Sequence, residues 1–253
     1  MAVVVTEQRA ISAARLADRI FPAASLVKLG VAMSWGARLR TNASAWSDSL
    51  TVPDSLRSEA GPEWFRVSRR YDPEKSLHDR IGGKATLHDL LDLMLAESSN
   101  FATAVLIDAM RLENIQRSLD AHGLDGMRLK HNFGDASVPA INTTTAAAAA
   151  GAMRELLQPG TGRDATADSM YAMLGRQRFR QGLPRVLPVG TANKTGTSGR
   201  THHDVAAFRR RDGSLVVTAI LTQGFRRESS AQQVMHRIGH QVNRACRTAE
   251  TTR

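Results

Sequence analysis

Apolar residues recur at helical spacing through most of the middle of the chain. One such segment runs from Ser25 to about Arg40, and Pro22 stands just ahead of it, where its missing N–H does no harm. Thr86 and Asp89 form a capping pattern at the start of a second segment. Apolar residues at i, i+3 and i+4 predict an amphipathic helix there, namely Leu87, Leu90, Leu91, Met94 and Leu95. Further helices are predicted at about 101–112, through the alanine-rich run that follows 142–145 and reaches 157, at about 165–175, and at 229–247.

Runs of strand character lie at the two ends of the chain. Residues 2–5 form a short β-branched run, whereas residues 12–19 show no clear periodicity. Near the C-terminus, three segments have strand character and are separated by turn residues: 188–197, 202–209 and 214–222. The N-terminal strand can join these three segments in one sheet.

The order of these elements predicts the fold class. A strand, a helical middle, antiparallel strands and a last helix indicate an α/β fold, in which an antiparallel sheet flanked by helices stands beside an all-helical lobe. We expect one domain over residues 1–253, with an α/β part at about 1–24 and 185–253. The helical lobe then covers about 25–184, and a cleft separates the two parts.

The composition is that of a soluble globular protein, with 42% hydrophobic and 23% charged residues. No stretch approaches 18 consecutive apolar residues, so no transmembrane helix is expected. The N-terminus lacks a basic region followed by a long apolar one; no secretory signal is visible, and the location stays open. Cys246 is the only cysteine, which leaves no internal disulfide; we expect it to be a buried, small apolar residue.

The net charge of +10 comes from 34 Lys+Arg against 24 Asp+Glu. A positive charge favours acidic partners, but the basic residues are scattered and no aromatic stacking platform accompanies them. We therefore expect no nucleic-acid partner. The run His202-His203-Asp204 does not favour a metal site, because side chains alternate along a strand, and no cofactor is expected.

Three short motifs carry the candidate chemistry. The first, Ser25 and Lys28 in a Ser-x-x-Lys pattern at the start of a helix, places both side chains on one helix face. A serine hydroxyl is a poor nucleophile until a base takes its proton, and a lysine in apolar surroundings can be that base. Alone, this pattern is more typical of a helix cap followed by a surface lysine, although the flanking apolar residues argue against exposure of Lys28.

The second and third motifs supply polar groups for a substrate. Ser98-Ser99-Asn100 lies in the short link between two predicted helices, where it offers a hydroxyl for proton relay and an amide for a carbonyl. Lys194-Thr195-Gly196-Thr197 lies on a predicted strand; Lys194 and Thr195 can bind a carboxylate, and Gly196 permits close approach of a backbone. The amides of Thr197 and Ser25 could form an oxyanion hole. Each motif alone is weak, and a cap or a turn explains it.

Together, in this order, the three motifs resemble those of class A β-lactamases and penicillin-binding proteins. The resemblance covers nearly the whole chain, including the context Phe-Pro-Ala-Ala-Ser-Leu-Val-Lys-Leu and the Asn-Thr-Thr-Thr that precedes the alanine-rich helix. It implies that Ser25 becomes acylated, that Lys28 acts as its base or in its proton relay, and that Ser98 passes a proton to the leaving nitrogen. It further implies substrate binding by Asn100, Lys194, Thr195, Gly196 and Thr197.

The sequence departs from the family pattern at three places. The family's Ω-loop glutamate, which activates the deacylating water, has no counterpart in His131–Asn142, where Asp135 is the only carboxylate and the candidate replacement. The middle of the second motif is Ser99 instead of the usual aspartate, a residue that often has a structural role. The chain start also lacks the family's N-terminal helix.

The resemblance therefore leaves several functions open. The first is β-lactam hydrolysis by a monomeric class A-like enzyme acting on a small molecule through an acyl-enzyme on Ser25. The alternative is a D-Ala-D-Ala carboxypeptidase or esterase, or a penicillin-binding protein that deacylates slowly. A non-catalytic β-lactam sensor and a glutaminase-like amidase are further alternatives.

Overall fold

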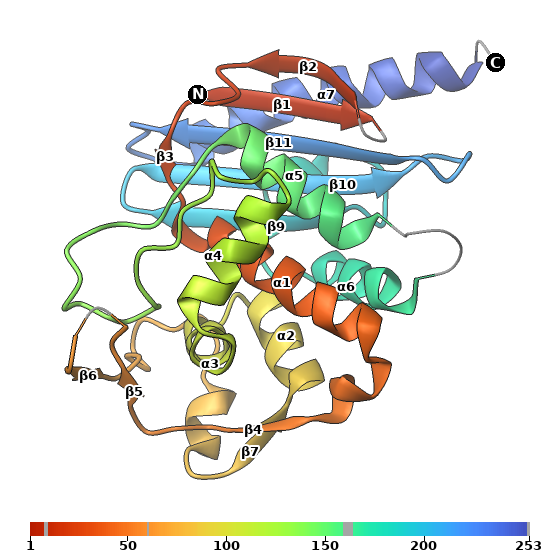
Figure 1. The fold of residues 1–253 in the computed structure, drawn as a ribbon. Helices are drawn as coiled ribbons and strands as arrows, with labels where there is room; N and C mark the ends of the chain where they lie inside the picture. The colour runs from red at the N-terminus through yellow and green to blue at the C-terminus, as the bar shows by residue number, and fades with distance from the viewer. Residues whose placement is uncertain (8–9, 60, 159–163, 252–253) are drawn as a thin grey trace.

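The computed structural model describes residues 1–7, 10–59, 61–158 and 164–251. Its centre is a five-stranded antiparallel sheet in the order β2-β1-β11-β10-β9 (Figure 1). The strands are β1 (Ala2–Glu7), β2 (Ala10–Arg15), β9 (Ala192–Ser198), β10 (Thr201–Arg209) and β11 (Leu215–Gln223). The N-terminal strand and the strands of the C-terminal third thus join in one sheet, as the sequence predicts, because β1 pairs with β11.

The sheet separates two apolar cores. Side chains alternate along β10, so that Val205 and Ala207 face the larger core while Ala206 and Phe208 face the smaller one. The smaller core is covered by α7 (Glu228–Thr251), whose buried residues lie at helical spacing: Ala231, Met235, Val242 and Cys246. Cys246 is buried and free, which confirms its prediction as a small apolar residue.

The larger core lies under the opposite face of the sheet. There α5 (Ala146–Leu157) packs against β11 and β1, and α1 (Val27–Thr41) packs on the other side of α5 (Figure 1). The alanines of α5 carry only a methyl group, which allows the sheet and α1 to come close. The remaining helices surround α1: α2 (Leu87–Leu95), α3 (Asn100–Met110), α4 (Leu112–Ala121) and α6 (Ala165–Gly175).

Short elements complete the helical side. The described residues include four 3₁₀ segments: η1 (Ala24–Leu26), η2 (Ala43–Ser47), η3 (Ser76–Arg80) and η4 (Leu183–Arg185). Three two-stranded ribbons pair β3 (Phe21–Pro22) with β8 (Thr143–Thr144), β4 (Ser49–Thr51) with β7 (Lys84–Thr86), and β5 (Leu56–Arg57) with β6 (Trp64–Phe65). The first ribbon lies directly before the Ser-x-x-Lys motif and fixes the path of the chain into it.

Besides the three ribbons, strand β2 and helix α4 were not predicted from the sequence. Residues 12–15, for which no periodicity was found, belong to edge strand β2, and all four are exposed, so no face of the strand is marked by apolar residues. A further helix, α4, follows α3 after Arg111, whose φ of 71° breaks the helical path. Its buried residues Ile115 and Leu119 did carry a helical signal.

None of the described helices is long and apolar enough to cross a membrane. Among the described residues, no group of three or more His, Cys, Asp or Glu side chains is placed to hold a metal ion. His202 and Asp204 lie on one face of β10 and His203 on the other.

Candidate active site

Ser25 lies in η1, at the junction between the β3–β8 ribbon and α1. The preceding residue, Ala24, has a φ of 46°, a conformation that costs an L-residue about 1 kcal/mol. Ala23 N donates a hydrogen bond of 2.9 Å to Asn142 O, which ties the segment to the chain before β8. The Ser25 side chain is half-buried, and within the described residues it makes no hydrogen bond. Its hydroxyl is therefore available to an incoming group.

Lys28 is the second residue of α1, and its side chain is fully buried. Its Nζ donates hydrogen bonds to Ser98 O at 2.6 Å and Asn100 Oδ1 at 2.8 Å, and it lies 3.2 Å from Ser98 Oγ. Burial, and then the positive charge of Lys194, hold the pKa of Lys28 well below its ordinary value, while Asp72 opposes this shift. A lysine with a lowered pKa supplies a neutral amine, which still has two N–H donors and gains a lone pair that can accept a proton.

Lys194, on β9, is the second fully buried lysine of the site. Its Nζ donates hydrogen bonds to Ser98 Oγ at 2.9 Å and Thr195 O at 3.2 Å. Burial lowers the pKa of Lys194 to about 7, against the opposing charge of Asp204. Near neutral pH this side chain can carry a positive charge at the position where the two lysines meet.

Ser98 is the residue on which the two lysines converge. It lies between α2 and α3 with a φ of 59°, a left-handed conformation that is strained for serine. Its Oγ lies within 3.2 Å of both amines. A hydroxyl between two amines with lowered pKa values can pass a proton from one to the other. The structure thus brings together Lys28, Ser98, Asn100 and Lys194, from three separate motifs.

The strand β9 forms one wall of the site at the edge of the sheet. Thr195 is half-buried and Thr197 is exposed, so both side chains are accessible to a ligand. Because β9 is an edge strand, the backbone groups on its outer side face no further strand. An added Cβ at Gly196 would lie 3.0 Å from Ala23 O and from Leu26 Cγ. Glycine at this position therefore lets β9 pack directly against the segment that carries Ser25.

The hydrogen bonds of Asp135 join it to residues outside this cluster. Its Oδ2 accepts from Ser58 Oγ at 2.6 Å, and its Oδ1 accepts from Ser137 N at 3.0 Å and Ser137 Oγ at 2.5 Å. Burial works to raise the pKa of Asp135, but the hydrogen bonds from Ser137 and Ser58 outweigh it and leave the pKa below its ordinary value. Both oxygens are thus engaged within the 131–142 loop and its neighbour.

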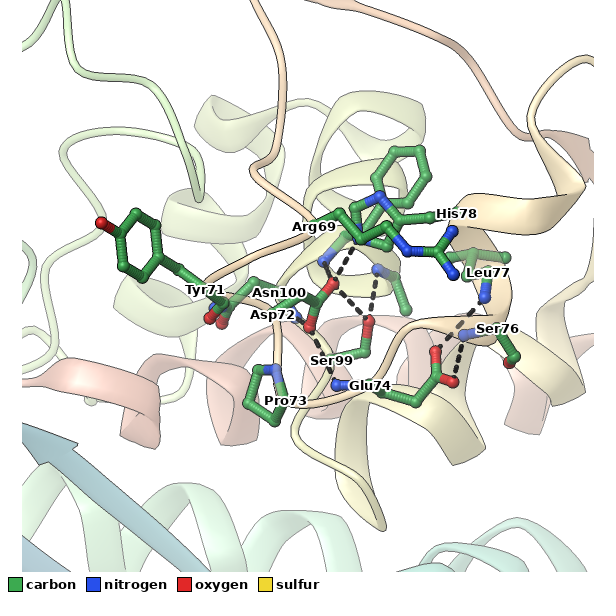
Figure 2. A network of polar contacts seen from close by, with 12 residues as sticks. Arg69, Tyr71, Asp72, Pro73, Glu74, Ser76, Leu77, His78, Ser99 and Asn100 are labelled. Atoms are coloured by element: carbon green, nitrogen blue, oxygen red, sulfur yellow. Dashed lines mark hydrogen bonds and ion pairs between the residues drawn. The ribbon is translucent and has the colours of Figure 1, made fainter.

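One buried carboxylate of the site was not found from the sequence. Asp72, in the segment between β6 and η3, accepts hydrogen bonds from the backbone of Asn100 and Phe101 and from the side chain of Ser99 (Figure 2). Its neighbour Tyr71 points away into solvent (Figure 2). The signal available in the sequence was a Tyr-Asp-Pro within a polar stretch, which does not distinguish this residue from a surface turn.

The fold has counterparts among solved structures. A β-lactamase from Sphaerobacter thermophilus is 22% identical, with a TM-score of 0.78 over 97% of this chain and 90% of that one. An ancestral class A β-lactamase is 21% identical, with a TM-score of 0.78 over 96% and 93% of the two chains. PBP-A is 18% identical, with a TM-score of 0.78 over 98% and 89%; a mutant of PBP-A is described as an acyl-enzyme complex with penicillin G. The fold is that of class A β-lactamases and PBP-A.

The sequence itself identifies the family. The profile of the β-lactamase enzyme family matches residues 3–246, nearly the whole chain. None of the curated proteins matches the sequence. This chain belongs to the β-lactamase enzyme family, which confirms the resemblance drawn from its three motifs.

Proposed function

We propose that this protein is a serine hydrolase that is acylated on Ser25 and hydrolyses the amide bond of β-lactams. One observation carries the proposal. Two fully buried lysines from different motifs, Lys28 and Lys194, both lie within 3.2 Å of Ser98 Oγ. Burying two amines side by side is costly for stability, so we infer that the arrangement serves proton transfer.

In the acylation step, Ser25 Oγ attacks the carbonyl carbon of the lactam. Its proton passes to the neutral Nζ of Lys28, directly or through a bridging group, and the carbonyl oxygen becomes negative. We assign the backbone N–H groups of Ser25 and Thr197 to this oxyanion. The C–N bond then breaks, and the proton returns to the leaving nitrogen through Ser98 Oγ. The product is an ester on Ser25 with the former lactam nitrogen as an amine.

Substrate binding falls to the groups around this centre. The ammonium form of Lys194 and the hydroxyls of Thr195 and Thr197 suit a carboxylate, the acidic group that β-lactams and acyl-D-Ala peptides share. Gly196 keeps β9 close to Ser25, so that the ligand lies between them. The side chain of Asn100 is half-buried and can hold the side-chain amide of a substrate.

The rate of deacylation distinguishes β-lactam hydrolysis from the alternative, a penicillin-binding protein or carboxypeptidase. Water must attack the ester, and a general base is most efficient when its pKa lies near the working pH. Asp135 is the candidate base, but its pKa is lowered and its two oxygens already accept hydrogen bonds from Ser58 and Ser137. This observation favours, as a second candidate, a penicillin-binding protein or carboxypeptidase in which the acyl-enzyme is long-lived.

The test is a time course of the purified protein with a chromogenic cephalosporin, followed by intact-mass analysis. Continuous colour with no trapped adduct would support β-lactam hydrolysis. A burst equal to the enzyme concentration, with a stable adduct on Ser25, would support the slowly deacylating alternative or a sensor. The absence of both colour and adduct would reject β-lactams and direct the search to peptide and ester substrates.

A matched pair of variants tests the nucleophile. Ser25→Ala should give neither colour nor adduct, because no other hydroxyl is assigned to attack. Ser49→Ala, at an exposed serine of β4, should behave as the unmodified protein. Labelling that persists in Ser25→Ala would reject the mechanism.

A further inference from the structure

Asp72 reaches the second motif from a distant part of the chain. Its side chain is fully buried, and it lies 27 residues before Ser99. Oδ1 accepts hydrogen bonds from Asn100 N at 2.8 Å and Glu74 N at 3.4 Å. Oδ2 accepts from Phe101 N at 2.9 Å and Ser99 Oγ at 3.3 Å, and it lies 3.1 Å from His78 Nε2 (Figure 2).

The Asp72 carboxylate and the Ser99 hydroxyl together accept hydrogen bonds from the first N–H groups of α3. The first N–H groups of a helix have no partner within the helix, and a negative charge is favoured beside them. Asp72 takes the N–H groups of Asn100 and Phe101, while Ser99 Oγ accepts from Ala102 N at 3.1 Å as the N-cap. Ser99 and Asp72 thus form one unit, with one hydroxyl and one carboxylate 3.3 Å apart.

This unit holds the two residues that contact Lys28. Ser98 and Asn100 flank Ser99 in the chain, and both accept hydrogen bonds from Lys28 Nζ. A displacement of residues 99–101 would therefore change the surroundings of that amine. Lys28 faces Lys194 on β9 and Asp72, and Asp72 faces His78 on η3 in addition to Lys28.

We propose that Asp72 is a positioning residue for acylation, and that Asp72 and Ser99 form an exchangeable pair in which the carboxylate of the second motif is supplied by residue 72. The exchange explains why Ser99 occupies the position where the family pattern has aspartate. With Ser99 as the hydroxyl and Asp72 as the carboxylate, the pair in this chain contains one of each group. The positioning role of Asp72 rests on the proposed function, whereas the exchange between Asp72 and Ser99 does not.

A double-mutant cycle tests the exchange without any substrate. Asp72→Ser leaves the pair with no carboxylate, and Ser99→Asp gives it two in contact, so each variant should lower the melting temperature by several degrees. The combination of both changes restores one carboxylate, and aspartate is also a good N-cap. It should recover more than half of the combined loss. If the double variant is as unstable as the sum of the single ones, the exchange is wrong.

The pH dependence of acylation tests the positioning role. The charge of Asp72 raises the pKa of Lys28, against its burial and Lys194. Asp72→Asn should therefore move the acid limb of the acylation rate to lower pH, by about half a unit or more, and leave the alkaline limb in place. Asp79→Asn is the matched control, because Asp79 is an exposed residue of η3 whose partner is Arg69. A rate that falls equally at every pH would show a structural role only.

Two further measurements keep these outcomes separate. If Asp72→Asn does not fold, the double exchange variant replaces it; because its carboxylate is retained, its acid limb should stay within about 0.3 units of the original. If the unmodified protein forms no adduct, the proposed function fails. The positioning role is then tested by measuring the pKa of Lys28 by NMR of its side chain. The Lys28 signal is assigned by its loss in Lys28→Met. A Lys28 pKa that is the same with and without the Asp72 charge would then overturn the positioning role.

Discussion

Lys28 Nζ donates a hydrogen bond of 2.8 Å to Asn100 Oδ1, and this bond joins the first motif of the site to the second across 72 residues of sequence. With Lys194 bound to Ser98 Oγ at 2.9 Å, the third motif is joined to the same point. The two amines thus share one short segment of chain, residues 98–100, at the start of α3. The position of that segment controls both of them.

Lys28→Met should slow acylation strongly and change the stability of the protein only slightly. Loss of a general base lowers a rate by about 10²–10⁴-fold, so labelling by a β-lactam should slow by that factor. Removal of a desolvated amine favours the fold, whereas Ser98 O and Asn100 Oδ1 lose a donor, so the melting temperature should change by only a few degrees. Intact-mass kinetics and thermal unfolding measure the two effects, with Lys84→Met at an exposed position of β7 as the control. Labelling within tenfold of the original rate would exclude Lys28 as the base.

The sequence predicted the elements that bury a strong apolar pattern. The helix after Thr86 is an example: Thr86 Oγ1 accepts from Asp89 N at 3.0 Å, as the capping pattern indicated, and Leu87, Leu90 and Leu91 are buried. Strand β2 was missed because its residues 12–15 are exposed and carry no pattern. An edge strand is defined by the pairing of its backbone with β1, and side-chain periodicity does not report this pairing.

The candidate site was predictable only where its residues form short motifs. Ser98 and Lys194 are predictable because each lies in a recognisable local pattern, and the structure places Ser98 Oγ 2.9 Å from Lys194 Nζ. Asp72 was not named, because its partners Ser99, Asn100 and Phe101 come from another part of the chain. The replacement of the usual aspartate by Ser99 could have prompted a search for a carboxylate elsewhere, but only the tertiary structure shows which one.

Gly196→Ala should disturb the site through Ser25. The new Cβ would lie 3.0 Å from Ala23 O, a backbone atom that cannot move alone, and 3.0 Å from Leu26 Cγ. Overpacking of this kind costs about 1–3 kcal/mol, and displacement of the nucleophile should slow acylation at least tenfold, about the effect of a misplaced reacting group. Gly175→Ala is the matched control, since nothing lies within 4 Å of its added Cβ. Equal behaviour of the two variants in stopped-flow acylation would contradict the tight packing of β9 on η1.

Asp135→Asn should lower stability more than it alters deacylation. The carboxylate accepts from Ser58 Oγ and from the N and Oγ of Ser137, and an amide can accept only at its single oxygen. We expect a loss of about 1–3 kcal/mol in the free energy of unfolding, measured by denaturant titration. The lifetime of the adduct on Ser25 should stay within a factor of about three. If that lifetime instead lengthens tenfold or more while acylation is unchanged, Asp135 is the deacylating base.

The rate constant for acylation should fall as the pH rises through about 7. Burial lowers the pKa of Lys194 to that value in the free protein, so its ammonium form is present below about pH 7 and is lost above it. Only the ammonium form attracts a substrate carboxylate. The second-order constant reports the ionisation of the free enzyme, and it should therefore show an alkaline limb with its midpoint near 7.

The variant Lys194→Met tests whether the alkaline limb comes from Lys194. Without the amine, acylation by a carboxylate-bearing β-lactam should be slower at every pH and should lose the alkaline limb, whereas Lys75→Met, at an exposed position, should keep it. A β-lactam whose carboxylate is esterified should show no such limb with the unmodified protein, because it presents no charge to the ammonium. If the esterified and the free acid compounds share the same alkaline limb, Lys194 does not act by binding the carboxylate, and of its two proposed roles only proton transfer through Ser98 Oγ would be left.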